Sequence, residues 1–421
     1  MKPNISYTVN HDLCTSCGIC SSACPSRAIT IMVKSGRFLP KIDDDLCKND
    51  KGCHRCFDVC PGIGVNLKHI AESQFTDENV KSDKLVGRYL KCFVGYSNDY
   101  NIRYHSASGG MVSQFLIFLL DKGYIDGAVV TAFDSKNDLL VRSYIATTVE
   151  EVLLAKSSKY GPVSLHEAAV DIKNATGSRY VVVGLPCHIE GFRKLEQCDK
   201  KIKEKIIGYF SIYCSSGRTF YLTEHVFKER NIKKDNLKYF SYRDEGCLGS
   251  MVAVEMDGHK TMDRYQNYYH PLRSFFVPRR CLFCIDHYGE LSDISFGDIH
   301  IDPYIEDKVG INSLVVRKKI WLDWLLEAQN DGYLTLNEIS VDVLNSSQIM
   351  AYRKKGRNGE FINLNRMLGR VVPKYDVDYL RKPSIKAWIS YTHTRIQQII
   401  GSHKCLWWLI GFLKKNTKNL K

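Results

Sequence analysis

Eight of the 16 cysteines in this chain lie within its first sixty residues, and their spacing constrains the fold more than any other feature. They form two runs, Cys14, Cys17, Cys20 and Cys24, then Cys47, Cys53, Cys56 and Cys60. A proline directly follows the last cysteine of each run. A chain of 421 residues can bury a sizeable core and needs no disulfides to stay folded. We therefore expect these cysteines to be thiolate ligands in a reducing compartment.

The spacing within the runs is typical of a bacterial-type ferredoxin domain with two 4Fe–4S clusters. In that pattern three thiolates bind one cubane, and the cysteine before the proline binds the other. The first cluster is thus predicted to be bound by Cys14, Cys17, Cys20 and Cys60. The second is predicted to be bound by Cys47, Cys53, Cys56 and Cys24, with a longer first gap than usual. Zinc is the alternative, but a four-thiolate zinc site needs neither the third closely spaced cysteine nor the proline.

The order of predicted elements divides the chain into four parts. Residues 1–70 form an α+β, ferredoxin-like domain with hairpin strands at 28–33 and 38–42. The polar segment 71–84 is predicted to be a linker. Residues 85–350 alternate strands with helices, which predicts an α/β domain with a mixed sheet. Its strands are expected at 89–95, 127–133, 180–183 and 205–214, and its helices at 110–120, 163–173 and 219–230.

The last part, residues 351–421, is predicted to be a helical, basic tail. It holds 16 basic and 3 acidic residues, which accounts for the whole net charge of +13. Within 385–421, Trp388, Trp407 and Trp408 stand among aliphatic residues and lysines, a pattern that suits a helix lying on an anionic bilayer. The alternative is a helix docked on the body with a solvated basic face. No signal peptide and no apolar run long enough to span a membrane is visible, so we expect a cytoplasmic protein. Its tail is a candidate for peripheral contact with the inner membrane face.

A second set of cysteines lies outside the ferredoxin unit. It consists of Cys187, Cys214, Cys281 and Cys284, which follow strands or lie in loops. Strand ends of an α/β sheet meet at one edge, where ligands bind. These thiolates are candidates for a third 4Fe–4S cluster, and the alternative is that they are ordinary buried cysteines.

Two short segments are candidates for binding a phosphorylated cofactor. Ser108-Gly109-Gly110 precedes a predicted helix, where free backbone N–H groups can receive a phosphate. Ser158-Lys159-Tyr160 offers a cation and hydroxyl groups before a turn. Without further support, the first is an ordinary helix start and the second a solvated loop.

Four motifs occur together in one order: Ser-x-Ser-Gly-Gly, Ser-Lys-Tyr, Gly-Leu-Pro-Cys-His-Ile-Glu-Gly-Phe-Arg, and a long segment from Arg279 to Asp298. From about residue 85 to 320 the chain thereby resembles the family of coenzyme F-420 hydrogenase/dehydrogenase beta subunits, which also contains 7-hydroxymethyl chlorophyll a reductase. The resemblance implies a flavin-binding domain that holds FAD beside the third cluster. The cofactor contacts that it implies are Ser108, Gly109, Gly110, Ser158, Lys159, Tyr160, Gly184, Pro186 and Asp298. Asp293 and Gly297 match the same family segment as Asp298.

The function expected from these features is that of an iron–sulfur flavoprotein oxidoreductase. Electrons would pass between a redox partner protein, the clusters, FAD and a small-molecule substrate. The resemblance implies F-420 as the substrate of methanogen relatives. It implies another small organic molecule for similar bacterial proteins, some of which are encoded with enzymes of surface-polysaccharide biosynthesis. His188 and His287 are candidate proton donors. The alternative function is an electron-transfer subunit whose partner carries the substrate chemistry; a nucleic-acid-binding role is disfavoured.

Overall fold

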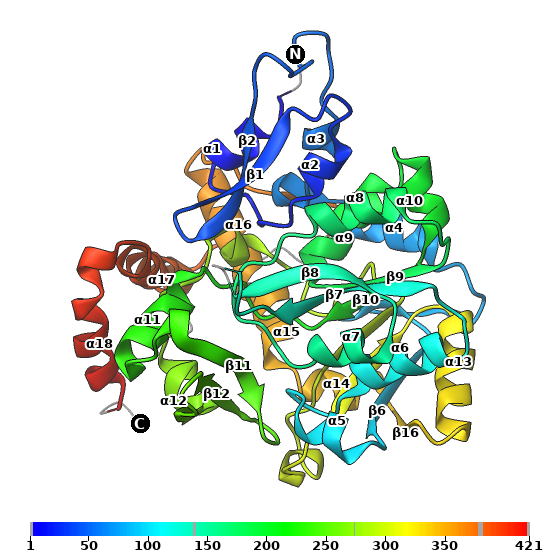
Figure 1. The fold of residues 1–421 in the computed structure, drawn as a ribbon. Helices are drawn as coiled ribbons and strands as arrows, with labels where there is room; N and C mark the ends of the chain where they lie inside the picture. Colours follow the sequence, from blue (N-terminus) through cyan, green and yellow to red (C-terminus); the bar gives the residue numbers. More distant parts are fainter. Residues whose placement is uncertain (1–2, 138–139, 273, 378–381, 419–421) are drawn as a thin grey trace.

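The centre of the protein is an eight-stranded mixed sheet, seen in a computed structural model that describes residues 3–137, 140–272, 274–377 and 382–418 (Figure 1). The strand order is β16-β6-β15-β14-β10-β9-β7-β8. The bounds are β6 Lys91–Ser97, β7 Gly127–Phe133, β8 Val141–Ala146, β9 Tyr180–Gly184, β10 Ile206–Ile212, β14 Ile294–Asp298, β15 Asn312–Val316 and β16 Leu334–Ile339. Strands β7, β9, β10 and β14 are parallel, and the others pair antiparallel. The predicted mixed sheet is confirmed.

Helices cover both faces of this sheet (Figure 1). One face packs against α8 His166–Asn174, α9 Pro186–Leu195 and α10 Lys200–Lys205. The other packs against α6 Met111–Asp121, α7 Val149–Leu154 and α13 Lys319–Asn330. Because side chains alternate along a strand, Val129 and Val182 enter the first core while Val130 and Val181 enter the second. Continuous apolar strands of this kind are expected where helices cover both faces.

The carboxyl ends of the parallel strands bring chemically distinctive residues to one edge of the sheet. Cys187 follows the end of β9, Cys214 follows β10, and Asp298 is the last residue of β14. Ligands bind at this edge in open α/β sheets. The topology therefore places the second cysteine set where a site is expected.

The N-terminal unit packs on the α8–α9 side of the sheet (Figure 1). It consists of α1 Ser6–Asn10, α2 Ile19–Ala23, β1 Ile29–Lys34, β2 Arg37–Ile42, α3 Arg55–Asp58, η1 Pro61–Ile63 and β3 Gly64–Val65. Strands β1 and β2 pair antiparallel, so the predicted hairpin is confirmed. The Leu165 N–H donates to the Cys17 carbonyl over 3.0 Å, and the Ser22 hydroxyl donates to the His166 carbonyl over 3.0 Å. The unit is thus bonded to the α8 region rather than tethered loosely.

The segment predicted to be a linker is mostly exposed but contains regular structure. It includes the end of α4 Leu67–Gln74 and the strand β4 Lys81–Asp83, which pairs with β5 Gly87–Tyr89. The reason is an apolar pattern within a polar stretch: Ile70, Ala71 and Phe75 recur at near-helical spacing and are buried in the main core.

A smaller three-stranded sheet lies beside the main one. It is formed by β11 Leu237–Asp244, β12 Ser250–Glu255 and β13 Lys260–Arg264, and packs with α11 Tyr221–Arg230 and α12 Tyr265–Tyr268. The C-terminal helices α17 Ile385–Ser402 and α18 Trp408–Lys418 lie near α11 (Figure 1). Other helices are α5 Tyr100–Tyr104, α14 Val341–Ser346, α15 Ile349–Arg353 and α16 Gly359–Met367. In the described part of the chain, no helix is both long enough and apolar enough to cross a membrane.

The C-terminal region is helical, as predicted, but its first part is core rather than tail. Lys354 and Lys355 are buried, and β17 Lys374–Tyr375 pairs with β3 of the N-terminal unit. Lys355 pairs with Glu290, and Lys354 lies beside Cys284. A count of charges along the sequence does not reveal such partners, because they come from elements about seventy residues away.

Candidate iron–sulfur and cofactor site

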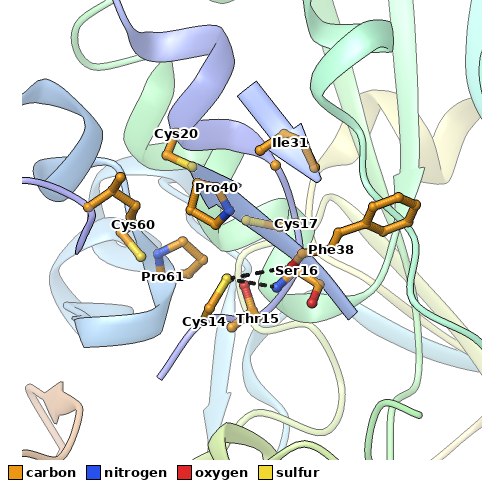
Figure 2. A pocket seen from close by; sticks show the side chains of 12 residues that line it. Cys14, Thr15, Ser16, Cys17, Cys20, Ile31, Phe38, Pro40, Cys60 and Pro61 are labelled. Atoms are coloured by element: carbon orange, nitrogen blue, oxygen red, sulfur yellow. Dashed lines mark hydrogen bonds between the residues drawn. The ribbon is translucent and has the colours of Figure 1, made fainter. Parts of the chain in front are cut away.

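Four cysteines of the N-terminal unit surround one pocket. Its lining includes Cys14, Cys17, Cys20 and Cys60, and Figure 2 shows their sulfur atoms around a common space. Ile5, Ile31 and Phe38 complete an apolar wall. The Ser16 N–H donates to the Cys14 sulfur over 3.4 Å, and the Gly62 N–H donates to the Cys60 sulfur over 3.3 Å. The donor set and its backbone N–H···S bonds fit a cubane cluster.

The other four N-terminal cysteines are also neighbours. Burial raises the pKa of the Cys56 thiol to about 11, and the nearby thiols that raise it further are those of Cys24, Cys53 and Cys47. These are the four residues that the sequence predicts for the second cluster. Cys24 therefore lies with the second run although it belongs to the first.

Among the residues that the structure describes, no three His, Cys, Asp or Glu side chains lie close enough together to hold one metal ion.

The second cysteine set lines a single cavity at the carboxyl edge of the main sheet. Its lining includes Cys187, Cys214, Cys281 and Cys284. Cys187 lies in the first turn of α9, and the loop η4 Arg279–Phe283 positions Cys281 and precedes Cys284. The Gly217 N–H donates to the Cys281 sulfur over 3.3 Å. Four thiols that come from three segments and converge in one cavity fit a third cluster.

The two cavities share a wall. Thr15 and Ser16 line both the Cys14–Cys60 pocket and the cavity around Cys187. Burial raises the pKa of Cys187 well above its usual value, and Cys17 is among the nearby thiols that add to the shift. The two cysteine sites are therefore adjacent, with thiols of both in electrostatic contact.

Buried cations surround the cavity of the second cysteine set. Lys354 Nζ donates to the Cys284 sulfur over 3.2 Å, and this lysine is 2 % exposed. Arg280 donates to the carbonyls of Gly62 and Pro61 over 2.7 and 2.9 Å, which fastens the η4 loop to the Cys60 turn. Positive charge beside a cluster stabilises its reduced, more negative state. Arg280 lies within the Arg279–Asp298 motif, whereas nothing in the sequence distinguishes Lys354 from any other basic residue.

The predicted segment Ser108-Gly109-Gly110 is buried at the start of α6. The Ser108 hydroxyl donates to the Ile311 carbonyl over 2.7 Å. The Met111 N–H donates to Asn312 Oδ1 over 3.1 Å, so one of the helix's free N–H groups already has a partner. A Cβ at Gly109 would lie 2.7 Å from the Gly95 carbonyl oxygen, which explains the glycine by close packing. The phosphate-binding role of this turn stays a prediction.

The second predicted segment lies next to the smaller sheet. Lys159 Nζ donates to the carbonyls of Ala155, Lys156 and Ser157 and so closes the end of α7. Tyr160 packs against a group of tyrosines whose members are Tyr242, Tyr265 and Tyr269. The Lys159 ammonium is therefore occupied by backbone, whereas Tyr160 belongs to an aromatic surface.

Two buried arginines flank that aromatic surface and were not distinguished by the sequence. Arg218 lies over the Tyr269 ring at 4.6 Å, and Arg243 lies over the Tyr265 ring at 5.0 Å. Arg218 Nε and Arg243 Nη2 are buried and have no hydrogen-bond partner among the residues that the structure describes. Arg218 also lines the cavity of the second cysteine set. Its position four residues after Cys214 was the one available sequence signal.

The two histidines proposed as proton donors are both buried and hydrogen-bonded. His188 Nδ1 accepts from the Leu185 N–H at 3.1 Å and Nε2 donates to the Val163 carbonyl at 3.1 Å, so the ring caps α9. His287 lies 3.1 Å from both the Cys214 carbonyl oxygen and Gln348 Oε1. Burial lowers the pKa of each imidazole to about 4. Burial thus disfavours the charged imidazolium at both positions, which argues for a structural role and leaves catalysis a prediction.

The remaining predicted residues form the support of the site. Asp293 is buried and binds Arg193 at 2.9 Å and Lys318 at 2.8 Å. Asp298 binds Arg243 at 2.8 Å. Gly184 allows His188 to approach, since a Cβ there would lie 2.9 Å from His188 Cβ, and Pro186 opens α9. Asp298 thus holds Arg243 against the candidate cofactor surface by an ion pair.

Comparison with known proteins agrees with this architecture. Residues 7–30 match a 4Fe-4S binding domain. Residues 92–170 match the N-terminal part of the coenzyme F420 hydrogenase/dehydrogenase beta subunit, and residues 177–342 match its C-terminal part. An iron–sulfur binding domain joined to this α/β fold defines a protein of an oxidoreductase-type class. The chain belongs to the family of coenzyme F420 hydrogenase/dehydrogenase beta subunits, and the resemblance seen in its motifs is confirmed.

Individual relatives are distant. An F(420)H(2) dehydrogenase subunit of Methanosarcina mazei is 25 % identical over 334 residues, which cover 76 % of this chain and 83 % of that protein. The coenzyme F420-dependent sulfite reductase of Methanocaldococcus jannaschii is 24 % identical over 303 residues, 69 % of this chain. The match covers only 42 % of that reductase. A chain in the F420-reducing [NiFe] hydrogenase complex of Methanosarcina barkeri superimposes with a TM-score of 0.54 at 18 % identity, over 70 % of this chain and 98 % of its own.

Proposed function

We propose that this protein moves single electrons between a partner redox protein and a cofactor site at the edge of its main sheet. Two 4Fe–4S clusters are held by the N-terminal quartets, and a third by Cys187, Cys214, Cys281 and Cys284. The observation that carries the proposal is the wall of Thr15 and Ser16 common to the two cavities. Since the sites are adjacent, electrons need cross only a short gap between the first cluster and the third.

FAD is proposed to bind beside the third cluster, against the tyrosines and the two arginines described above. Buried guanidinium donors without partners suit the phosphate oxygens of a dinucleotide. Stacked rings, such as Tyr265 and Tyr269 with centroids 4.7 Å apart, suit a planar aromatic group. A bound flavin supplies the exchange between one-electron transfer and two-electron hydride chemistry. The protein's own contribution is to position it next to the cysteine cavity and to exclude water.

The substrate is proposed to be a small organic molecule that accepts or donates a hydride. Coenzyme F420 is one candidate, since it appears in the names of the relatives above. A second candidate function is that of an electron-transfer subunit. It is favoured by the superimposed structure, which belongs to a hydrogenase complex.

Anaerobic purification followed by iron, sulfide and flavin analysis tests the proposal. Three clusters and one flavin predict roughly twelve irons and about one FAD per chain. Bound zinc without flavin would overturn it. Arg218→Met should lower the flavin content while the iron content stays unchanged, and Arg179→Met, at an exposed ion pair with Asp126, serves as the matched control. Equal flavin content in both variants would remove Arg218 from the proposed site.

Substrate and partner can be separated by reduction experiments. Anaerobic mixing of the reduced protein with F420 should oxidise flavin and clusters in single turnover if the chain itself acts on F420. An isolated protein that exchanges electrons only with a second protein would instead favour the role of an electron-transfer subunit.

A further inference from the structure

Helix α17 has an exposed apolar stripe in addition to the face that packs on the body. Ala387, Tyr391 and Gln398 form the packed face and are buried. The opposite side presents large apolar residues that are between 47 % and 81 % exposed: Ile385, Trp388, Ile389, Ile396 and Ile399. On α18, Trp408 and Phe412 are also exposed, by 63 % and 65 %. Helix α17 is therefore docked on the body, which was the alternative given in the sequence analysis. Its outward face, however, is apolar rather than basic.

The stripe follows the helix from end to end. At 3.6 residues per turn, positions 385, 389, 396 and 399 fall on one side, and Trp388 lies at its border. Eighteen residues make a helix about 27 Å long. Such a surface is larger than the isolated apolar residues found on an ordinary protein surface.

The charges around the stripe are mainly positive. No aspartate or glutamate occurs from residue 382 to 418. Arg279, Arg370 and Arg395 line a groove that reaches Trp388 at the border of the stripe. Asp12 also lines this groove, and its carboxylate is already paired with Arg37 at 2.7 Å, so the groove keeps a net positive charge. Within the described chain the guanidinium groups of two groove arginines bond neutral oxygens: Arg395 that of Gln398 at 2.7 Å, and Arg370 that of Asn365 at 3.3 Å. Their charge is therefore not neutralised by these bonds.

We propose that the outer face of α17 and α18 binds the surface of an anionic lipid bilayer. The isoleucines and tryptophans enter the boundary between headgroups and acyl chains, and the arginines contact lipid phosphates. A convex stripe along a single helix suits a flat, fluid surface. A second copy of the chain fits less well, because it would bring two unneutralised basic borders together. Peripheral binding would hold the cofactor site near lipid-soluble or membrane-linked reactants.

Vesicle flotation of the full, anaerobically purified chain tests this proposal. The chain should float with vesicles of phosphatidylcholine and phosphatidylglycerol and remain unbound with phosphatidylcholine alone. The double variant Ile389→Glu/Ile396→Glu should reduce the bound fraction at least tenfold. Leu154→Glu/Met256→Glu adds the same charge at equally exposed apolar positions outside the C-terminal helices and should bind like the wild type. Arg370→Gln/Arg395→Gln should weaken binding and make it less sensitive to salt.

Three results would overturn the proposal. The first is no binding of the wild type to anionic vesicles, and the second is undiminished binding of the Ile389/Ile396 variant. The third is a wild-type dimer in light scattering that this variant converts to monomer, which would assign the face to a second copy. Unchanged melting temperature and visible cluster absorption show that each variant is folded, so a loss of binding is not a loss of structure.

Discussion

The ammonium of Lys354 donates one hydrogen bond to the Cys284 sulfur over 3.2 Å and another to the Asp286 carbonyl over 2.6 Å. Burial opposes the charge of Lys354, but the nearby thiols keep its pKa above the usual value. A permanent positive charge therefore lies against a proposed ligand of the third cluster. Hydrogen bonds and charge next to the sulfurs are the means by which proteins set cluster potentials.

Lys354→Met should lower the midpoint potential of the third cluster, because the reduced state loses a stabilising charge. We expect a shift on the order of 60 mV, which corresponds to a tenfold change in a one-electron equilibrium. Redox titration followed by electron paramagnetic resonance measures it, with the two N-terminal clusters as internal references. Lys354→Arg should preserve most of the potential. Lys91→Met removes an exposed lysine paired with Glu338 and should shift nothing; an equal shift in that variant would contradict the local explanation.

Cys187→Ser should remove one cluster and leave the other two. The expected loss is about four irons per chain, since one thiolate of a four-cysteine site is missing. Iron analysis and electron paramagnetic resonance measure the change. Cys198→Ser is the matched control, because Cys198 is exposed and lies outside the three proposed quartets. Full iron content in Cys187→Ser would exclude Cys187 as a ligand.

Gly297→Ala should destabilise the edge of the sheet that holds Cys214. A Cβ at this position would overlap the ring of Tyr213, the residue before Cys214. Forced overpacking typically costs about 1–3 kcal/mol, so the melting temperature should fall by several degrees. Gly411→Ala, where an added Cβ meets nothing within 4 Å, should have no such effect. A Gly297→Ala protein as stable as the wild type, with its full iron content, would contradict the packing explanation.

Glu190 should make the stability of the protein depend on pH. Burial, followed by the charge of Asp286, raises the pKa of this carboxyl to about 8, and in the described part of the chain its Oε1 has no hydrogen-bond partner. Above pH 4.5 the folded protein then binds more protons than the unfolded chain, so the free energy of unfolding falls as pH rises toward 8. Glu190→Gln is neutral at every pH and should remove this fall.

The melting temperatures of the wild type and Glu190→Gln should therefore diverge as pH increases. Each pH unit changes the free energy of unfolding by about 1.4 kcal/mol when the folded and unfolded states differ by one proton. Between about pH 5.5 and 7.5, the free energy of unfolding of Glu190→Gln should therefore rise by about 2 kcal/mol relative to that of the wild type. Glu204→Gln, at an exposed pair with Lys200, should show no divergence. A constant difference between wild type and Glu190→Gln across this range would show that Glu190 is ionised when folded.

Local patterns predicted the secondary structure well where side-chain periodicity was strong. The strand predicted at 127–133 is β7, and the helix predicted at 110–120 is α6 within one residue at each end. The linker predicted at 71–84 rested on polar composition, whereas two apolar residues four positions apart, Ala71 and Phe75, are buried at the start of this segment. Composition averages over a segment, but burial is decided by single residues on one face.

The sequence by itself determined which residues are the candidates for the chemistry. Thiolate ligands must be cysteines, and their spacing within a run is a local property, so the N-terminal quartets and the family motifs are readable without a structure. Which distant residues surround the second cysteine set was decided only by the tertiary structure. Lys354 is seventy residues from Cys284 in the sequence, and only the fold brings it and Arg218 to the cavity of the four cysteines. The physical reason is that burial and charge proximity depend on which distant segments pack together, and spacing along the chain does not encode that.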